Sequence, residues 1–174
     1  GVFGTPLYTS ASSLFYFIVF GVFFSECGGG QLLIAVGMKF SNKSSGGPAK
    51  AAVISSGLMG MVSGSAVANV STTGVMTIPM MKKVGYHPEE AGAIEAVAST
   101  GGQIMPPIMG AAAFLMADYL GVPYSDIIGR AILPAVLYFL GIFIAVHLEA
   151  KKSGLKGISR DQLPHVMELI KDSY

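Results

Sequence analysis

Small polar residues interrupt two apolar stretches of this sequence, and both groups combine hydroxyl or amide side chains with glycine or proline. The first group comprises Ser63, Gly64, Ser65, Asn69, Thr72 and Thr73. The second group comprises Ser99, Thr100, Gly101, Gly102, Gln103 and Pro106. Where such residues break a helix at membrane depth, free N–H groups at one half-helix end favour an anion, and free carbonyls with hydroxyls can hold Na⁺. The two groups therefore predict a shared binding site for a small anion and a sodium ion.

Each group also has an ordinary structural interpretation. Ser63-Gly64-Ser65 suits the close packing of small residues between membrane helices, and Asn69 could cap or cross-link helices. Gly101-Gly102 with Pro106-Pro107 could produce only a helix kink. We favour a binding site because the two groups occur together, and because the first lies in a segment of unusual length.

Glu95 is the one acidic residue deep within the apolar sequence. Ionisable residues inside membranes generally mark functional sites, so Glu95 is a candidate for an ion or proton role. The alternatives are contact with an aqueous vestibule and pairing with a lysine. An enzyme is not expected, because an intramembrane serine nucleophile needs a nearby base. No histidine or lysine lies deep in the apolar sequence, and the G-x-S-x-G motif is absent.

The segment that carries the first group, residues 48–83, has the length of a re-entrant helical hairpin. One membrane crossing needs about 20 apolar residues and two need about 40. The apolar part, residues 51–81, falls between these lengths, which predicts two arms of roughly 22 Å that enter and leave on one side. Lys50 and Lys82-Lys83 would then share a side, as the positive-inside rule requires.

The remaining segments complete the prediction of an all-α membrane protein with a re-entrant hairpin and a discontinuous helix. Residues 1–47 are expected to form a first transmembrane helix at 7–25 and an interfacial helix at 31–41. Residues 84–150 are expected to form a discontinuous transmembrane helix, broken at the second polar group, and then a further transmembrane helix. Residues 151–174 are polar and are expected to form a cytoplasmic linker.

The composition is that of a membrane protein, with 52% apolar residues, 12% charged residues and a mean hydropathy of +0.61. The basic residues form no stripe, which argues against a nucleic-acid partner, and the lone Cys27 excludes a disulfide framework.

Of the 11 Lys and Arg residues, only Arg130 falls on the far side of the expected arrangement, so the other side is taken as cytoplasmic. No G-x-x-x-x-G-K-[ST] motif for ATP occurs, and the abrupt start at Gly1 suggests a piece of a larger protein.

Two long stretches resemble the large membrane subunit of tripartite ATP-independent periplasmic (TRAP) transporters. They read GLMGMVSGSAVANVSTTGVMTIPMMKKVGY (residues 57–86) and EEAGAIEAVASTGGQIMPPIMGAAAFLMA (residues 89–117). Within the second, EAVASTGGQ with PPIMGAAAF is most similar to the fused permeases of the TAXI subgroup.

The resemblance implies an elevator-type secondary transporter built from two inverted repeats, of which this chain would supply the first. It implies sodium-driven import of small organic acids across a bacterial or archaeal cytoplasmic (inner) membrane by a multi-pass protein, with Na⁺ as coupling ion and no other cofactor. The implied partners are a periplasmic substrate-binding protein, a small membrane subunit or its fused equivalent, the second inverted repeat and the lipid bilayer. The alternative function is a channel-like or non-transporting membrane interaction subunit.

The resemblance also implies roles for particular residues. The hairpin-tip positions would be occupied by Ser63, Gly64, Ser65 and Asn69. The broken-helix positions would be occupied by Ser99, Thr100, Gly101 and Gly102, and the two sets together would build the first sodium site beside the substrate. The implied sodium ligands are Ser63, Gly64, Asn69, Ser99 and Gly101. Many large subunits lack an acid where Glu95 stands, so the resemblance assigns it no role.

Overall fold

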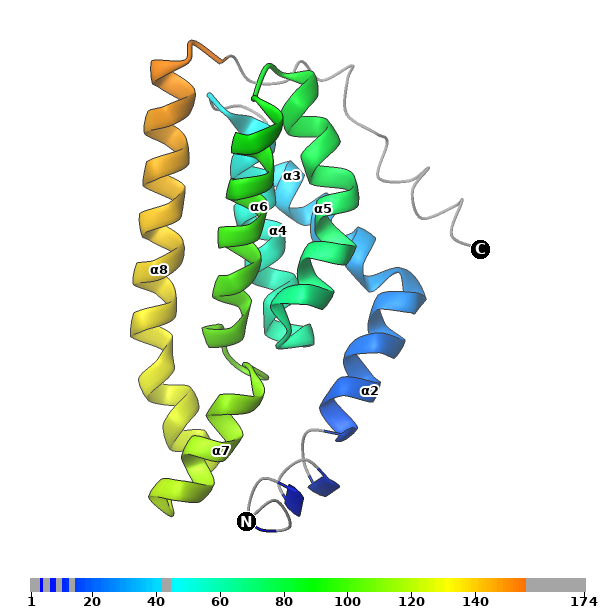
Figure 1. The fold of residues 1–174 in the computed structure, drawn as a ribbon, viewed down its shortest axis with the longest axis vertical. Helices are drawn as coiled ribbons and strands as arrows, with labels where there is room; N and C mark the ends of the chain where they lie inside the picture. Colours follow the sequence, from blue (N-terminus) through cyan, green and yellow to red (C-terminus); the bar gives the residue numbers. More distant parts are fainter. Residues whose placement is uncertain (1–3, 5–6, 9–10, 13–14, 42–44, 156–174) are drawn as a thin grey trace.

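The computed structural model describes residues 4, 7–8, 11–12, 15–41 and 45–155 (Figure 1). This part of the chain contains helices and no strand, so the all-α prediction is confirmed there. The helices run, in chain order, over Phe15–Phe24 (α2), Gly30–Ser41 (α3), Gly47–Ser63 (α4), Ala66–Lys83 (α5), Pro88–Gly101 (α6), Ala111–Leu120 (α7) and Tyr124–Lys152 (α8). From residue 156 onward, the expected cytoplasmic linker lies outside the described residues.

Helix α4 lies at the centre of the bundle and packs against α3, α5, α6 and α8. Small side chains in a helix let neighbouring backbones approach closely. At Gly60, a Cβ atom would lie only 2.2 Å from the Cα of Gly102, so no larger residue fits at this crossing. The small buried residues of α4 include Ala49, Ala51, Ala52, Ser55, Ser56, Gly57 and Gly60.

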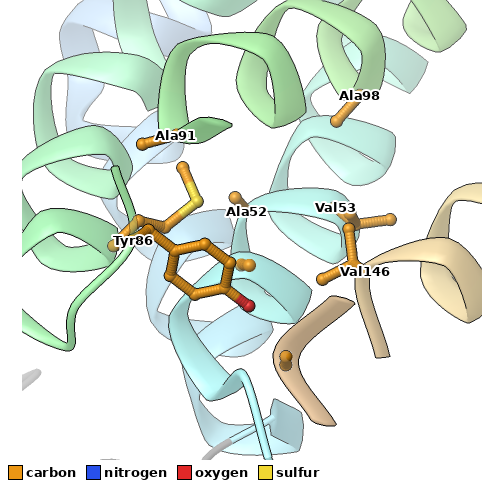
Figure 2. Packing of buried hydrophobic residues seen from close by; sticks show 9 residues of the cluster. Ala52, Val53, Tyr86, Ala91, Ala98 and Val146 are labelled. Carbon is orange, nitrogen blue, oxygen red and sulfur yellow. The ribbon is translucent and has the colours of Figure 1, made fainter. Parts of the chain in front are cut away.

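A hydrophobic cluster joins α4 to the elements around it (Figure 2). Ala52 and Val53 of α4 face Tyr86 in the turn between α5 and α6, together with Ala98 of α6 and Val146 of α8. Each of these five side chains is at most 4% exposed. Apolar contacts therefore join α4, α6, α8 and the turn between α5 and α6.

Helix α8 is the longest described helix, with 29 residues, or about 44 Å at 1.5 Å per residue. Among the described residues, it alone is long and apolar enough to cross a membrane by itself, and most of its surface is exposed. Helix α2 and the helical segment Glu26–Ser41 are long and apolar enough to cross a membrane only when the two are taken together, and there is a bend of 41° between them.

The N-terminal part is divided into two helices, as the sequence predicts: α2 ends at Phe24, α3 begins at Gly30, and Gly28 takes a non-helical φ of 83° at the bend between them. The expected spanning helix at 7–25 lies partly outside the described residues. Helix α3 buries Ile34 and Met38 in a cluster with Ala51 of α4. It is thus packed on the bundle through one face, and its place relative to the bilayer surface stays a prediction.

Helices α4 and α5 form a helical hairpin whose arms have 17 and 18 residues. The arms are longer than the sequence predicts, because both helices continue beyond the apolar part to Gly47 and Lys83. Their outer ends lie at the same end of the bundle as the C-terminal end of α8 (Figure 1). Lys50 Nζ lies 2.8 Å from His147 Nδ1, which ties the start of α4 to the end of α8.

Helix α6 begins and ends where its sequence predicts. Pro88 occupies the first turn, and the Glu90 carboxylate accepts a hydrogen bond from the His87 N–H at 3.3 Å. The α-helix ends at Gly101, and a 3₁₀ turn follows over Gly102–Ile104. The backbone then runs without helix until α7 begins, and α7 in turn ends at Gly121, whose φ is 64°.

Candidate binding site

The turn of the α4–α5 hairpin is made by Gly64 and Ser65. Gly64 has a φ of 59°, and its N–H bonds the carbonyl of Gly60, which ends α4. Ser65 is extended, and its hydroxyl accepts a hydrogen bond from the N–H of Ala68 at 3.3 Å, which caps the start of α5. Two helix ends of opposite polarity therefore meet at this turn.

The break after α6 folds against the same turn. The N–H of Ile108 bonds the carbonyl of Met61 near the end of α4 at 3.4 Å. Gly64 contacts Met109 so closely that a Cβ at Gly64 would lie 1.9 Å from the Met109 carbonyl oxygen. Inside the break, the N–H of Gly110 bonds the carbonyl of Gln103 at 2.7 Å. The two interrupted segments are thus in direct backbone contact.

A cavity of about 440 Å³ lies between the hairpin turn, the break and α2. Two helix N-termini border this cavity, because Ser65 precedes α5 and Gly110 precedes α7. The ends of α4 and of the 3₁₀ turn also reach it, through Ser63 and Ile104. The lining residues are Phe17, Ile18, Ser63, Gly64, Ser65, Gln103, Ile104, Ile108, Met109, Gly110, Ala111 and Ala112. None of these is charged, so polar recognition here would come from backbone groups and small side chains.

The end of α6, where the break begins, is set against the middle of α8. A Cβ at Gly101 would lie 2.3 Å from the ring of Tyr138, which is the central residue of α8. The Tyr138 hydroxyl donates to the carbonyl of Val97 at 2.8 Å. Gly57 of α4 lies against Phe139 in the same region. The break therefore lies level with the centre of the longest helix.

A separate cluster of polar side chains, the enclosed group, lies buried between α4, α5 and α6 around the carboxyl of Glu95. The hydroxyls of Ser56 and Ser99 each donate to Oε1 at 3.0 Å. The Thr77 hydroxyl donates to Oε2 at 2.5 Å, and the Thr73 hydroxyl also contacts Oε1. All five residues are at most 1% exposed. Neither the aqueous vestibule nor the lysine partner considered for Glu95 is among these contacts.

Asn69 connects this enclosed group to the break. Its side-chain Nδ2 donates to the carbonyl of Ser56 at 2.7 Å, and its main-chain carbonyl accepts a hydrogen bond from the Thr73 hydroxyl at 2.8 Å. A Cβ at Gly102 would lie 3.0 Å from the same Nδ2. Asn69 is therefore a cross-link between helices, at the point where α4 and α5 meet the break.

The structure divides the residues predicted for the site into separate places. Ser63, Gly64, Ser65 and Gln103 line the cavity. Thr73 and Ser99 belong to the enclosed group around Glu95, and Asn69 connects that group to the break. Gly101 faces α8, Gly102 faces α4, and Pro106 is buried. Thr72 and Thr100 return their hydroxyls to carbonyls of their own helices, at Ala68 and Ala96.

The five implied sodium ligands have different neighbours in the structure, and their joint role at one ion stays a prediction. Ser63 and Gly64 line the cavity, Asn69 and Ser99 are enclosed on its buried side, and Gly101 packs against the ring of Tyr138. Within the described part of the chain, no three His, Cys, Asp or Glu side chains come together as a metal site would require.

Two contributors to the enclosed group, Ser56 and Thr77, are missing from the sequence prediction. The signal for Thr77 was present, because Asn69, Thr73 and Thr77 recur every four residues and so lie on one helix face. Ser56 carries no such signal, since its role depends on how α4 packs against α6.

These features together define a helical membrane protein in which helix ends, rather than charged side chains, line the cavity. The family described as "Tripartite ATP-independent periplasmic transporter, DctM component" matches residues 3–174. The chain therefore belongs to the TRAP transporter permeases, as a part of the large membrane subunit.

Curated relatives agree with this assignment. The chain is 29% identical over 145 residues to a protein of Haemophilus influenzae named as a TRAP transporter large permease, covering 83% of this chain and 34% of that protein. It is 30% identical over 151 residues to the isethionate TRAP transporter permease protein DctMQ of Oleidesulfovibrio alaskensis, covering 84% of this chain and 23% of that protein. The chain thus spans about a third or less of the length of these relatives.

Proposed function

We propose that this chain is the part of a sodium-coupled, binding-protein-dependent permease that forms one half of the site for a small organic acid. The observation that carries the proposal is the direct contact between the hairpin turn and the break after α6, beside one cavity. Membership of the TRAP permeases supports transport as the general role.

The cavity suits a carboxylate because two helix N-termini border it. The free N–H groups and the dipole at the start of a helix favour negative charge. Ser65 at the start of α5 and Ala111 at the start of α7 both line the cavity. An acidic substrate could therefore be held here without an arginine or a lysine.

The end of α4 suits a cation for the opposite reason. The last carbonyls of a helix lack partners within it and carry partial negative charge. Ser63 and Gly64 place such carbonyls and one hydroxyl at the cavity, and we propose that the coupling sodium binds there.

The depth of the turn supports a re-entrant hairpin over two full crossings. The turn at Gly64 lies seven residues past Gly57, which contacts the centre of α8 at Phe139. Seven residues of helix span about 10 Å, and half of a hydrocarbon core is about 15 Å thick. If α8 crosses the membrane symmetrically, the turn remains inside the hydrocarbon region.

The other partners are also proposals. The DctMQ relative is a permease whose name combines two components, which supports association of this chain with a small membrane subunit, fused or separate. A periplasmic substrate-binding protein would deliver the substrate, and a second inverted repeat would complete the site. The cytoplasmic (inner) membrane of a bacterium or archaeon would be the location.

Uptake into proteoliposomes tests the proposal, using the full-length permease with its binding protein. We expect Asn69→Leu to abolish sodium-driven uptake, because Leu removes the bond to the Ser56 carbonyl and crowds Gly102. Thr72→Val is the matched control, since the Thr72 hydroxyl bonds only its own helix, and it should retain uptake. Normal sodium-driven uptake by Asn69→Leu would contradict the site, and solute flux without any sodium requirement would indicate the channel-like alternative.

A further inference from the structure

Helices α4 and α8 pack together, and a second cavity, of about 370 Å³, lies along their contact. We call this cavity the α4–α8 groove. Its lining is apolar and comes from α4 between Val53 and Met61, from α8 between Val136 and Phe143, and from Met105 in the break. Val136 is 52% exposed, so the groove is open to the surroundings of the bundle.

Both walls of the groove become basic at the same end. On α8, positions 136, 140, 143, 147 and 151 recur every three or four residues and so share one helix face. Beyond Phe143, that face carries His147 and then Lys151. On α4, positions 50, 54, 57 and 61 share a face in the same way, and Lys50 precedes the apolar part. The contact between Lys50 and His147 shows that the two basic ends coincide.

The basic groups at this end lie close to one another and to the groove. Lys50 Nζ lies 2.8 Å from His147 Nδ1 and 5.4 Å from the centre of the Phe143 ring. Because an ammonium group can only donate, Nδ1 accepts, and the neutral His147 ring keeps an N–H donor at Nε2. The charge of Lys151 acts on both residues. The start of α4 adds the positive end of a helix dipole, so this end of the groove favours an anion.

Acidic side chains near this end lie on other faces of their helices. Glu149 is two residues past His147, which is about 200° around the helix. Glu149 and Glu90 both act on Tyr86, which is not among the residues that line the groove. The face of α8 that continues the groove therefore carries His147 and Lys151 without an acid between them.

The size of the groove suits a single chain better than a helix. An α-helix with its side chains is about 10 Å in diameter and so fills about 800 Å³ per 10 Å of its length. The lining of α8 from Val136 to Phe143 extends over about 10 Å, and the groove holds less than half of that volume. A slender apolar molecule with one anionic end matches both the width of the groove and its charge.

We propose that the α4–α8 groove binds an anionic phospholipid of the bilayer, with one acyl chain between the two helices and the phosphate at the basic end. His147 and Lys151 would contact the phosphate, and Lys50, which is 2% exposed, would add its charge from beneath. The basic end is on the side expected to be cytoplasmic, and basic pockets between membrane helices on that side suit anionic headgroups. The inference does not depend on the coupling ion or on the substrate.

Photo-crosslinking in liposomes locates the lipid on the full-length permease. The probe is phosphatidylglycerol with a diazirine on one acyl chain, and peptide mass spectrometry identifies the labelled residues. We expect label at Ile54 and Leu58, which line the groove and are half-buried. Unlabelled phosphatidylglycerol should remove this label at a lower mole fraction than phosphatidylcholine, because only phosphatidylglycerol carries a net negative charge. No label at these residues, or equal competition by the two lipids, would overturn the proposal.

Charge variants test the basic end. Lys151→Gln should raise the mole fraction of phosphatidylglycerol needed for competition about fivefold, from the usual contribution of one basic residue near an anionic headgroup. Lys152→Gln is the matched control, because Lys152 lies 3.9 Å from Glu149, which offsets its charge, and competition should be nearly unchanged. Equal effects of the two substitutions would contradict a phosphate at the end of the groove.

Groove variants test the acyl chain independently of charge. Val136→Trp places a large ring in the groove and should lower the label at Ile54 and Leu58. Leu137→Trp is the matched control, because Leu137 is 58% exposed and does not line the groove, and the label should persist. Equal labelling of the two variants would contradict the proposed position of the chain. Unchanged labelling together with a lower unfolding temperature in Val136→Trp would show that a protein segment fills the groove, and would also overturn the proposal.

Discussion

Buried hydroxyl groups in this bundle serve two different acceptors. Thr73 and Thr77 each reach both the carbonyl four residues earlier and the carboxyl of Glu95, whereas Thr72 reaches only its own helix. Sequence spacing identifies the polar face of α5 but not its partner, because the partner is fixed by packing against α6. For this reason Glu95 could be singled out from its type and its place in the apolar sequence, while the hydroxyls that surround it could not.

Tyr86 offers a test of a buried side chain outside the membrane segments. It lies in the turn between α5 and α6, is 3% exposed, and its hydroxyl has no hydrogen-bond partner among the described residues. An unsatisfied buried polar group costs about 1–3 kcal/mol. We therefore expect Tyr86→Phe to unfold at the same or a higher temperature at pH 7, as followed by thermal denaturation in detergent. A clearly lower midpoint would show that the hydroxyl has a stabilising partner.

The same residue predicts a loss of stability at alkaline pH. Burial, with smaller contributions from Glu90 and Glu149, raises the pKa of Tyr86 to about 12 from 10.0. Since the folded form holds its proton more tightly than the unfolded form, this contribution to stability is complete below pH 10 and declines as the pH rises toward 12. The alkaline decline in the unfolding midpoint should be smaller in Tyr86→Phe. Identical declines would contradict this pKa.

At the scale of the elements, the interruptions were easier to predict than the lengths of the helices. Helix α4 ends before Gly64, which adopts a positive φ without strain. Helix α6 ends at Gly101 with a helical φ of −60°, and the prolines that cannot continue a helix follow at Pro106 and Pro107. The hairpin arms extend past the apolar part to Gly47 and Lys83, since helix formation does not end where apolar composition ends. Helix α3 packs on α4, a contact that its short apolar stretch did not reveal.

The contact between turn and break depends on the absence of a side chain at Gly64. Gly64→Ala places a Cβ 1.9 Å from the Met109 carbonyl and also carries the strain of a positive φ, which alone costs on the order of 1–2 kcal/mol. We expect a clear fall in the thermal unfolding midpoint and loss of uptake.

Gly121→Ala is the matched control for this substitution. Gly121 has a φ of 64°, close to the 59° of Gly64, but no atom lies within 4 Å of a Cβ built there. It should therefore show the strain without the clash, and the difference between the two variants measures the contact with Met109. Equal effects of both substitutions would mean that the turn and the break are not in contact.

For the whole molecule, composition was sufficient to predict an all-helical membrane protein, and two motif-bearing stretches were sufficient to predict the family. The arrangement of the parts was less predictable. The residues of the two polar groups line one cavity only in part, because Thr73 and Ser99 bond Glu95 and Asn69 bonds the carbonyl of Ser56. Residue type indicates that these side chains need polar partners, but three-dimensional packing decides whether the partner is a ligand or another helix.

The central claim is that the hairpin turns back inside the membrane, where it meets the break after α6. Depth-dependent fluorescence quenching by lipid-attached quenchers measures this in the full-length permease, with Cys27 replaced and a single fluorophore placed by Val67→Cys or by Tyr119→Cys. Val67 follows the turn and Tyr119 lies near the end of α7, and the two are 78% and 71% exposed. We predict quenching from within the hydrocarbon region for Val67 and from the headgroup region for Tyr119. Headgroup depth at both positions would mean that α4 and α5 each cross the membrane, and would contradict the account.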